Sequence, residues 1–280
     1  MISIVTPSFR QLDWLRLAIA SVADQEGVEW EHIIQDAGTS GIEEFLRSDF
    51  QYLVDDKRLQ LFVEKDEGMY DAINRGLRRA RGEICAYLNC DEQYLSGALR
   101  SVVSFFDANP DIDVLFGDVV LTDPHGQPLS YRRTVLPTQW HIQAAHLNTS
   151  TCATFFRREL VEKGFHFDPQ WRAIGDMVWV HSLLLAQVPM KTLSRPLATF
   201  TFTGENLGGT SLSTDEATRW QGRSRSSVWR ALAVLRHRLG KAFHGAYQRR
   251  DLEIGIYTQD SPQRRVSRPA KKLGYRWPRL

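Results

Sequence analysis

Apolar and polar positions alternate along the first part of the chain with two different periodicities. Short runs rich in β-branched residues, ISIVTP at 2–7 and LQLFV at 59–63, have the length and composition of buried strands. Between them, apolar residues recur every three or four positions, as in residues 12–22, which is the spacing of an amphipathic helix. Strands and helices that alternate in this order predict a mainly parallel central sheet with helices on both faces.

The stretch from Glu64 to Glu92, EKDEGMYDAINRGLRRARGEICAYLNCDE, contains the clearest succession of elements. An acidic turn with Gly68 opens a helix, and Gly82 is expected to end it. The apolar run ICAYL that follows predicts a buried strand, which finishes abruptly in the polar residues NCDE. This strand end is therefore a candidate site.

The later apolar runs predict a sheet that becomes mixed. Residues 111–133 have the pattern of two strands joined at the turn 123–126, and residues 190–202 that of a closing strand. Between them come a strand that leads into a helix start at 150–160 and an apolar helix within 171–187. We expect residues 1–205 to form one domain, because no repeat or low-complexity linker interrupts them.

Basic residues dominate the chain after Arg219, and residues 206–280 are expected to form a basic helical extension with a loosely ordered tail. Two interpretations of the helix within it are open. It packs on the domain with its basic side in solvent, or it lies on an anionic membrane surface through residues 223–250, apolar side down. The apolar positions that share one face of this helix are Val228, Ala231, Leu232, Leu235, Leu239, Phe243 and Ala246.

The composition is that of an ordinary globular protein, and the net charge of +2 hides the contrast between an acidic first part and a basic end. The three cysteines form no CxxC pair and favour free thiols in a reducing compartment. No basic leader and no membrane-spanning apolar run is present, so we expect a cytoplasmic protein, peripheral on the inner face of the plasma membrane if the helix binds lipid. No nucleic-acid partner is expected, because no recognised nucleic-acid-binding module accompanies the basic residues.

Acidic residues follow three consecutive elements of the predicted sheet: Asp36, the turn with Asp66, and the pair Asp91 and Glu92. Because the carboxyl ends of parallel strands meet at one edge, these side chains are expected to converge. Carboxylate oxygens at such an edge can hold a divalent cation against a diphosphate. The alternative is that Asp91 only caps the helix predicted to begin near Ser96.

These residues resemble the glycosyltransferases of family 2, which have the GT-A fold. The segments TPSF, IIQDAGTSG and 64–92 are similar to the first half of that family, and TCATFFRREL with FDPQWRAIGDMVWVHSLL is similar to the second half. The resemblance covers most of residues 1–205 and does not extend to the basic tail. The first turn, TPSFRQ, contains no glycine, which argues against a dinucleotide-binding fold.

The resemblance implies a nucleotide-sugar donor bound at this edge. Asp36 would bind the base or ribose, and the backbone of Thr6 and Pro7 would line that pocket. Asp91 with Glu92 would hold Mg²⁺ or Mn²⁺ on the diphosphate. The remaining donor-side candidates are Asp66, Asp71, Asn74 and Asn89. Asn89 offers an amide oxygen but no charge, so modest metal affinity is expected, and Asp71 and Asn74 have a structural alternative in the first turns of a helix.

By the same resemblance, Asp176 would be the general base of an inverting transfer. It would take a proton from an acceptor hydroxyl while that oxygen attacks the anomeric carbon. The alternative is that Asp176 caps the following helix. His146, Trp140 and Trp171 are candidates for the acceptor side, with packing roles as their alternative.

The resulting prediction is a metal-dependent inverting glycosyltransferase that moves a sugar from a nucleotide-sugar donor to a hydroxyl of a glycan or lipid-linked acceptor, in cell-surface polysaccharide or glycolipid assembly. A sugar-nucleotide nucleotidyltransferase is the alternative enzyme, although TPSFRQLDWL lacks the glycine-rich loop that would grip a triphosphate. The non-catalytic alternative is a protein that binds nucleotide sugars or a membrane surface.

Overall fold

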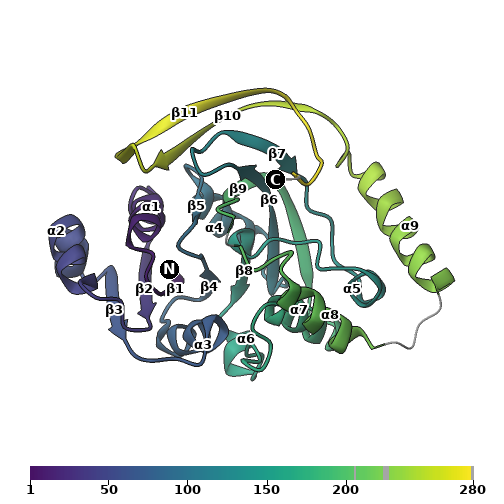
Figure 1. Ribbon diagram of the computed structural model, residues 1–280, viewed down its shortest axis with the longest axis horizontal. Helices are drawn as coiled ribbons and strands as arrows, with labels where there is room; N and C mark the ends of the chain where they lie inside the picture. The colour runs from purple at the N-terminus through teal and green to yellow at the C-terminus, as the bar shows by residue number, and fades with distance from the viewer. Residues whose placement is uncertain (205, 223–226, 279–280) are drawn as a thin grey trace.

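The computed structural model describes residues 1–204, 206–222 and 227–278. Its centre is a nine-stranded sheet with the order β3-β2-β1-β4-β8-β6-β9-β5, and β7 lies off this path, paired with β6 (Figure 1). The strands are β1 (Ile2–Ser8), β2 (Trp30–Asp36), β3 (Leu59–Val63), β4 (Ile84–Tyr87), β5 (Glu92–Tyr94), β6 (Val114–Thr122), β7 (Pro128–Arg132), β8 (Thr154–Arg157) and β9 (Met190–Thr201).

Helices cover both faces of this sheet. They are α1 (Leu12–Ala23), α2 (Ile42–Asp55), α3 (Met69–Arg79), α4 (Ala98–Ala108), α5 (Gln139–Ala144), α6 (Glu159–Glu162), α7 (Gly175–Leu185), α8 (Ser211–Gln221) and α9 (Ser227–Phe243). One hydrophobic cluster joins α1, α2 and α4 to one face, and a second joins α3, α6 and α7 to the other. Neighbouring strand residues such as Ile33 and Ile34 belong to different clusters, as strand geometry requires.

The first half of the sheet is parallel, as predicted. β1 pairs in parallel with β2 and with β4, and β2 pairs in parallel with β3. Helix α3 ends at Arg79, three residues earlier than the position of Gly82. Gly82 instead lies against the start of β1, where an added Cβ would be 2.7 Å from the Ser3 nitrogen. Close packing therefore requires this glycine.

The second half of the sheet is mixed, which confirms the expectation from the sequence. β8 is antiparallel to both of its neighbours, β4 and β6. This double reversal returns β6 to the direction of β4, and β9 is parallel to β6. The carboxyl ends of β4, β6 and β9 therefore point to the same edge of the sheet. β5, which the sequence did not predict, is antiparallel to β9.

The prediction of a loosely ordered tail was wrong. β10 (Arg250–Thr258) and β11 (Ser261–Leu273) form an antiparallel hairpin that arches over β7 and α1 (Figure 1). Ile254, Ile256 and Leu273 are buried in one cluster with Leu95, which follows β5, and with Val120 of β6 and Tyr131 of β7. Arg265 also donates to both carboxylate oxygens of Asp24 at the end of α1, at 2.5 and 2.7 Å. Alternating apolar residues and this ion pair order a segment whose basic composition suggested disorder.

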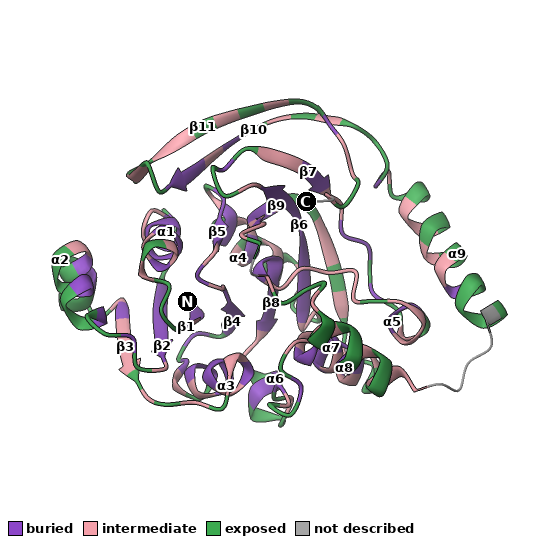
Figure 2. Ribbon diagram, viewed as in Figure 1, coloured by how far each residue is buried: buried purple, intermediate pink, exposed green. Residues whose placement is uncertain are grey.

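Helix α9 lies at the periphery, and its orientation contradicts the first of the two interpretations, in which the apolar face packs on the domain. It packs on α5 through Ala233 and His237, and its predicted apolar face points away from the domain (Figure 2). The exposed fractions along that face are 65% for Val228, 56% for Leu232, 53% for Leu235, 52% for Leu239 and 88% for Phe243. The packed helix with a solvated basic back is therefore not what forms. Among the described residues, every helix is too short or too polar to cross a bilayer.

Candidate active site

The carboxyl ends of β1, β2 and β4 lie side by side, because these strands are parallel and in register. Ser8 pairs with Asp36 at the ends of β1 and β2, and Val5 pairs with Tyr87 at the end of β4. The Cys90 thiol donates to the Pro7 carbonyl at 3.4 Å and holds the segment after β4 against the end of β1. Burial raises the pKa of Cys90 to about 12, and the charges of Asp91 and Asp36 add to this. The residues that follow β2 and β4 therefore meet at one edge.

Asp36 is fully buried at this edge and organises the loop that follows β2. Its Oδ1 accepts hydrogen bonds from the Gly38 and Thr39 nitrogens at 2.8 and 2.6 Å, and its Oδ2 accepts one from the Thr39 hydroxyl at 2.7 Å. Gly38 has φ +106°, a conformation that favours glycine. In this arrangement Asp36 shapes the loop through both of its carboxylate oxygens.

The acidic turn before α3 lies next to the Asp36 loop. Asp66 accepts a hydrogen bond from the Gly68 nitrogen at 3.0 Å. Burial raises the pKa of Asp66, and the charges of Asp71 and Asp36 act in the same direction. Burial opposes ionisation of Asp71 as well, but hydrogen bonds from Arg75 and the Glu67 nitrogen lower its pKa overall. The turn is thus an acidic cluster whose charge is partly balanced by Arg75.

The segment after β4 carries two acidic side chains with different partners. Asp91 is partly exposed, and its Oδ2 accepts a hydrogen bond from Asn206 at 3.0 Å. Glu92 is fully buried as the first residue of β5, and its Oε2 accepts from the Asn89 nitrogen at 2.8 Å. Burial raises the pKa of both carboxyl groups, and the charge of Asp91 further raises that of Glu92. The capping alternative for Asp91 is wrong, because α4 begins after Gly97.

Two oxygens beside Asp91 lack partners, which suits a cation. Asn89 Oδ1 and Glu92 Oε1 are buried and have no hydrogen-bond partner in the described part of the chain. A buried oxygen without a donor is costly unless a ligand satisfies it. Within 1–204, 206–222 and 227–278, no group of three or more His, Cys, Asp or Glu side chains could hold a metal by itself. Asn89, Asp91 and Glu92 thus fit a hard cation that takes its remaining oxygens from a diphosphate and water.

Asp176 lies in the first turn of α7 and is held by contacts from two directions. Its Oδ1 accepts hydrogen bonds from the Tyr70 hydroxyl at 3.2 Å and from the Met177 nitrogen at 2.8 Å. Burial raises its pKa, although both hydrogen bonds oppose that change. Asp176 Oδ2 accepts no hydrogen bond from the described residues. Since Ile174 is the capping residue, Asp176 is not the N-cap that the alternative required.

The loop before Asp176 is fixed by close packing and by a buried acid. An added Cβ on Gly175 would lie 2.6 Å from the Tyr70 ring, so glycine allows α7 to approach α3. Glu216 of α8 is 6% exposed and accepts hydrogen bonds from the Arg172 and Ala173 nitrogens at 3.0 and 2.9 Å. The carboxylate of Asp176 is therefore positioned by α3, α7 and α8 together.

Tyr87 at the end of β4 connects the two acidic groups. Its pKa is raised well above the usual value by burial first, and then by Tyr70 and the charges of Asp176 and Glu92. Tyr70, in the first turn of α3 after the Asp66 turn, donates its hydroxyl to Asp176 at 3.2 Å, which places Asp176 beside that turn. The contact between Cys90 and Pro7 holds the segment of Asp91 at the end of β1.

Other candidate residues have structural partners. Thr6 is buried and its hydroxyl is 2.8 Å from His32 Nε2. Asn74 is 5% exposed and uses both amide groups on the Phe167 backbone, at 2.6 and 3.0 Å. Trp140 contacts Trp229 of α9 with ring centroids 4.8 Å apart, and Trp171 is buried beneath Arg219. His146 lies 4.9 Å from the His141 ring. Trp140 and His146 therefore belong to the α5–α9 contact.

Sequence analysis did not identify Tyr70, Asn206 and Glu216. Tyr70 lies within the motif that carried the resemblance, so its position next to Asp71 was a usable signal. Asn206 follows β9 and is 115 residues from Asp91 in the sequence. Glu216 lies in α8, about 40 residues after Asp176. No local pattern marks either residue, because their role depends on the register of β9 and the docking of α8.

The chain is similar in sequence to known glycosyltransferases. The chain is 32% identical over 107 residues to a putative teichuronic acid biosynthesis glycosyltransferase of Bacillus subtilis, covering 38% of this chain and 41% of that protein. It is 28% identical over 122 residues to a PGL/p-HBAD biosynthesis glycosyltransferase of Mycobacterium bovis, covering 43% of this chain and 47% of that protein. The chain thus spans less than half the length of these curated relatives.

Solved structures show the same fold at low identity. TarS of S. aureus residues 1–349 in complex with UDP-GlcNAc has a TM-score of 0.61 and 14% identity, covering 86% of this chain and 72% of that chain. A mannosyltransferase of Pyrobaculum calidifontis in complex with GDP-Man and Mn²⁺ has a TM-score of 0.54 and 15% identity, covering 71% of this chain and 56% of that chain. The expected GT-A fold is confirmed.

The family itself follows from the sequence profile described as glycosyl transferase family 2, which matches residues 3–165. That span exceeds half of the 280 residues and includes the loop of Asp36, the turn of Asp66 and the segment with Asp91. The chain therefore belongs to glycosyl transferase family 2.

Proposed function

We propose that this protein transfers a sugar from a nucleotide-sugar donor to an acceptor hydroxyl, with inversion at the anomeric carbon. The observation that carries the proposal is the set of unpartnered oxygens on Asn89 and Glu92 beside Asp91, on the same side of the sheet as Asp176. One side of the site offers ligands for a cation on a diphosphate, and the other offers a base.

The donor is proposed to lie along the carboxyl edge of β1, β2 and β4. The Asp36 loop and the backbone of Thr6 and Pro7 would receive the nucleoside. The diphosphate would lie near Asn89, Asp91 and Glu92. A bound Mg²⁺ or Mn²⁺ would stabilise the negative charge of the leaving diphosphate. The nucleotide sugars in the titles of the structural neighbours support this class of donor.

The proposed base is Asp176, through the oxygen that its neighbours leave free. Tyr70 and the Met177 nitrogen fix Oδ1. Oδ2 would then accept the proton of the acceptor hydroxyl as its oxygen bonds to the anomeric carbon. The bond from that carbon to the diphosphate breaks, and its electron pair leaves with the nucleoside diphosphate. Burial raises the pKa of Asp176, which strengthens it as a base in its ionised form.

A donor panel tests this proposal. Purified protein with UDP-, GDP- and dTDP-sugars and Mn²⁺ should release nucleoside diphosphate when glycan or lipid-linked acceptors are supplied. Asp176→Asn should lower the turnover by about 10² to 10⁴, the usual contribution of a general base. Asp215→Asn, an exposed aspartate on α8, is the matched control and should retain wild-type turnover. Equal turnover of Asp176→Asn and wild type would remove Asp176 from the mechanism.

The acceptor is proposed to be a glycan or lipid-linked molecule at a membrane surface, in cell-surface polysaccharide or glycolipid assembly. The teichuronic acid and PGL relatives support this setting. Helix α9 supports it as well, because Val228, Leu232, Leu235, Leu239 and Phe243 form one exposed apolar stripe. Arg236 and Arg238, both exposed, flank the stripe on either side. An anionic bilayer matches this combination, since lipid covers the stripe and headgroups pair with the arginines.

Vesicle binding tests the membrane contact. Leu235→Glu with Leu239→Glu should weaken binding to phosphatidylglycerol vesicles by about tenfold or more, because two apolar contacts are lost. The control is Leu185→Glu on α7, a leucine with a similar exposed fraction of 60%. It should bind like wild type. Vesicle binding that survives the double substitution would show that α9 is not the contact surface.

A further inference from the structure

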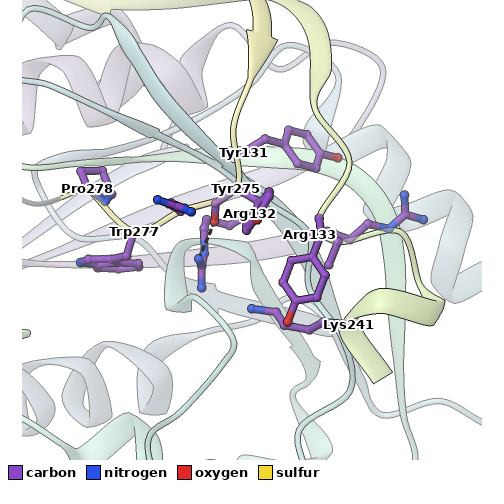
Figure 3. A pocket seen from close by; sticks show the side chains of 10 residues that line it. Tyr131, Arg132, Arg133, Lys241, Tyr275, Trp277 and Pro278 are labelled. Atoms are coloured by element: carbon purple, nitrogen blue, oxygen red, sulfur yellow. Dashed lines mark hydrogen bonds between the residues drawn. The ribbon is translucent and has the colours of Figure 1, made fainter. Parts of the chain in front are cut away.

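A cavity of about 690 Å³ lies between the end of β7, the end of α9 and the last described residues of the chain. We call it the C-terminal pocket. It is enclosed by the end of β7, the last turn of α9 and the segment after β11 (Figure 3). Its lining residues are Tyr131, Arg132, Arg133, Lys241, Ala246, Tyr247, Tyr275, Arg276, Trp277 and Pro278. Four of them are cationic, and the lining contains no acidic side chain.

The cations of the C-terminal pocket have no acidic partner at ion-pair distance among the described residues, although the charge of Arg133 acts on the buried Asp118 behind Tyr131. Arg132, Arg133, Lys241 and Arg276 form no salt bridge with any described residue. The guanidinium of Arg132 donates to the Tyr275 carbonyl at 2.8 Å, which leaves its charge unpaired. Burial and the charge of Arg132 lower the pKa of Lys241 to about 8. Cations gathered in this way are stabilised by a bound anion.

The shape of the pocket fits an anion that carries an organic substituent. Tyr247 and Tyr275 lie with ring centroids 4.9 Å apart, and the Arg132 guanidinium is 5.4 Å from the Trp277 ring. These aromatic walls offer apolar surface next to the positive charge. The cavity volume is within the range of pockets for small organic ligands.

The C-terminal pocket lies next to the segment that leads to the acidic edge, on the side of α9 opposite its exposed stripe. Trp277 contacts Phe202 with ring centroids 5.2 Å apart, and the Thr203 nitrogen donates to Asn206, whose amide donates to Asp91. On the other side, Lys241 comes from the last turn of α9, two residues before Phe243. A ligand in this pocket would therefore lie between the acidic edge and the proposed membrane surface.

We propose that the C-terminal pocket binds the phosphate or diphosphate group of a lipid-linked acceptor while the lipid chain remains in the bilayer beneath α9. Lys241, Arg132 and Arg276 pair with the phosphate oxygens. The aromatic walls contact the first groups on either side of the phosphate. The acceptor hydroxyl is thereby directed past Phe202, Thr203 and Asn206 toward Asp176. This inference rests on the proposed function, because it presumes an acceptor that is held at a membrane.

Binding of a polyprenyl monophosphate tests the inference without turnover. The full chain is titrated with phosphatidylcholine vesicles that contain a small fraction of this lipid. Lys241→Gln and Arg276→Gln should each weaken binding by about tenfold, the loss expected for one charge-assisted hydrogen bond. Because Arg276 is exposed, its substitution leaves the fold intact. Lys271→Gln, an exposed lysine on β11 outside the pocket, should bind like wild type.

Two further binding measurements distinguish the possible sources of the phosphate group. Inorganic pyrophosphate should bind wild type more weakly than the lipid does, since it gains nothing from α9. Phosphatidylglycerol vesicles should bind the Arg276→Gln variant nearly as well as wild type. The inference is overturned if Lys241→Gln and Arg276→Gln leave polyprenyl phosphate binding unchanged. It is also overturned if free pyrophosphate binds wild type as tightly as the lipid does, or if the two substitutions weaken phosphatidylglycerol binding as much as polyprenyl phosphate binding. Donor turnover of wild type is scored separately, so failure of the transferase proposal would be seen independently.

Discussion

The acidic edge of the sheet and the C-terminal pocket present the same problem with opposite charges. At the edge, burial raises the pKa of Asp91 and Glu92, and in the pocket it lowers the pKa of Lys241. In both places the charged form is disfavoured until a partner of opposite charge is present. The supports differ: buried strands hold the edge, whereas a peripheral helix and the last residues of the chain close the pocket. The side chains at the edge are therefore expected to be in position before a ligand binds, whereas those of the pocket are expected to rearrange when it binds.

The largest effect that would test this comparison is expected at the edge. Asp91→Asn removes charge from the proposed cation site, and donor turnover should fall by about 10² or more. Added Mn²⁺ should restore part of the loss, because the variant retains a weaker oxygen ligand. Asp111→Asn, an exposed aspartate after α4, should leave turnover unchanged. Full activity of Asp91→Asn at low Mn²⁺ would contradict the assignment of the edge.

The second test compares two leucines that share a helical pattern but not an environment. Leu15 of α1 is fully buried, so Leu15→Ala should lower the free energy of unfolding by about 2 to 5 kcal/mol. Leu235 of α9 is 53% exposed, so Leu235→Ala should change it by less than about 0.5 kcal/mol. Denaturant unfolding measures both values. Equal losses would mean that α9 is covered in solution, for example by a second copy of the chain.

The third test uses pH to weaken the attachment of α9. His141 and His237 stack at 3.7 Å between α5 and α9. Burial and neighbouring cationic groups lower the pKa of His141 to about 3 and that of His237 to about 4. The detached state binds protons below about pH 6.5, so packing of α9 should weaken as the pH falls from there toward 4.

Tryptophan fluorescence follows this change, because Trp140 and Trp229 are in contact across the same interface. His237→Gln should flatten the fluorescence curve, whereas His125→Gln, an exposed histidine after β6, should leave it unchanged. A curve that His237→Gln does not alter would assign the transition to another group.

The smallest expected effect concerns the charge of the C-terminal pocket. The folded-state pKa of Lys241 is about 8, so its ammonium group is lost as the pH rises through that value. Affinity for polyprenyl phosphate vesicles should decrease several-fold between about pH 7 and about pH 10, and Lys241→Gln should remove most of this dependence. Lys271→Gln should keep it. If the affinity of Lys241→Gln decreased with pH as much as that of wild type, other cations would govern binding.

The sequence predicted the parts of the molecule whose pattern is local. The apolar run before Asn89 and the helical spacing after Gly68 identified β4 and α3, and their order placed Asp36 and Asp91 at one edge. Each of these elements buries its own apolar residues, so the pattern and the fold agree.

The parts that were missed depend on contacts between distant segments. β5 has three residues, too few for a recognisable alternation, and it exists because β9 pairs with it. The hairpin shows alternation in Leu252, Ile254 and Ile256, but the surrounding arginines obscured it. For α9, helical spacing identified the apolar face, yet spacing contains no information about what covers that face.

The reversed strand β8 has a consequence for variation among enzymes built this way. Because β8 turns the direction twice, the segment that follows β9 reaches Asp91 through Asn206 without sharing hydrogen bonds with β1, β2 or β3. Insertions after β9 are therefore expected to change the proposed acceptor side while the strands that support the proposed nucleotide site stay in register. Donor and acceptor preferences become separately adjustable properties of one chain.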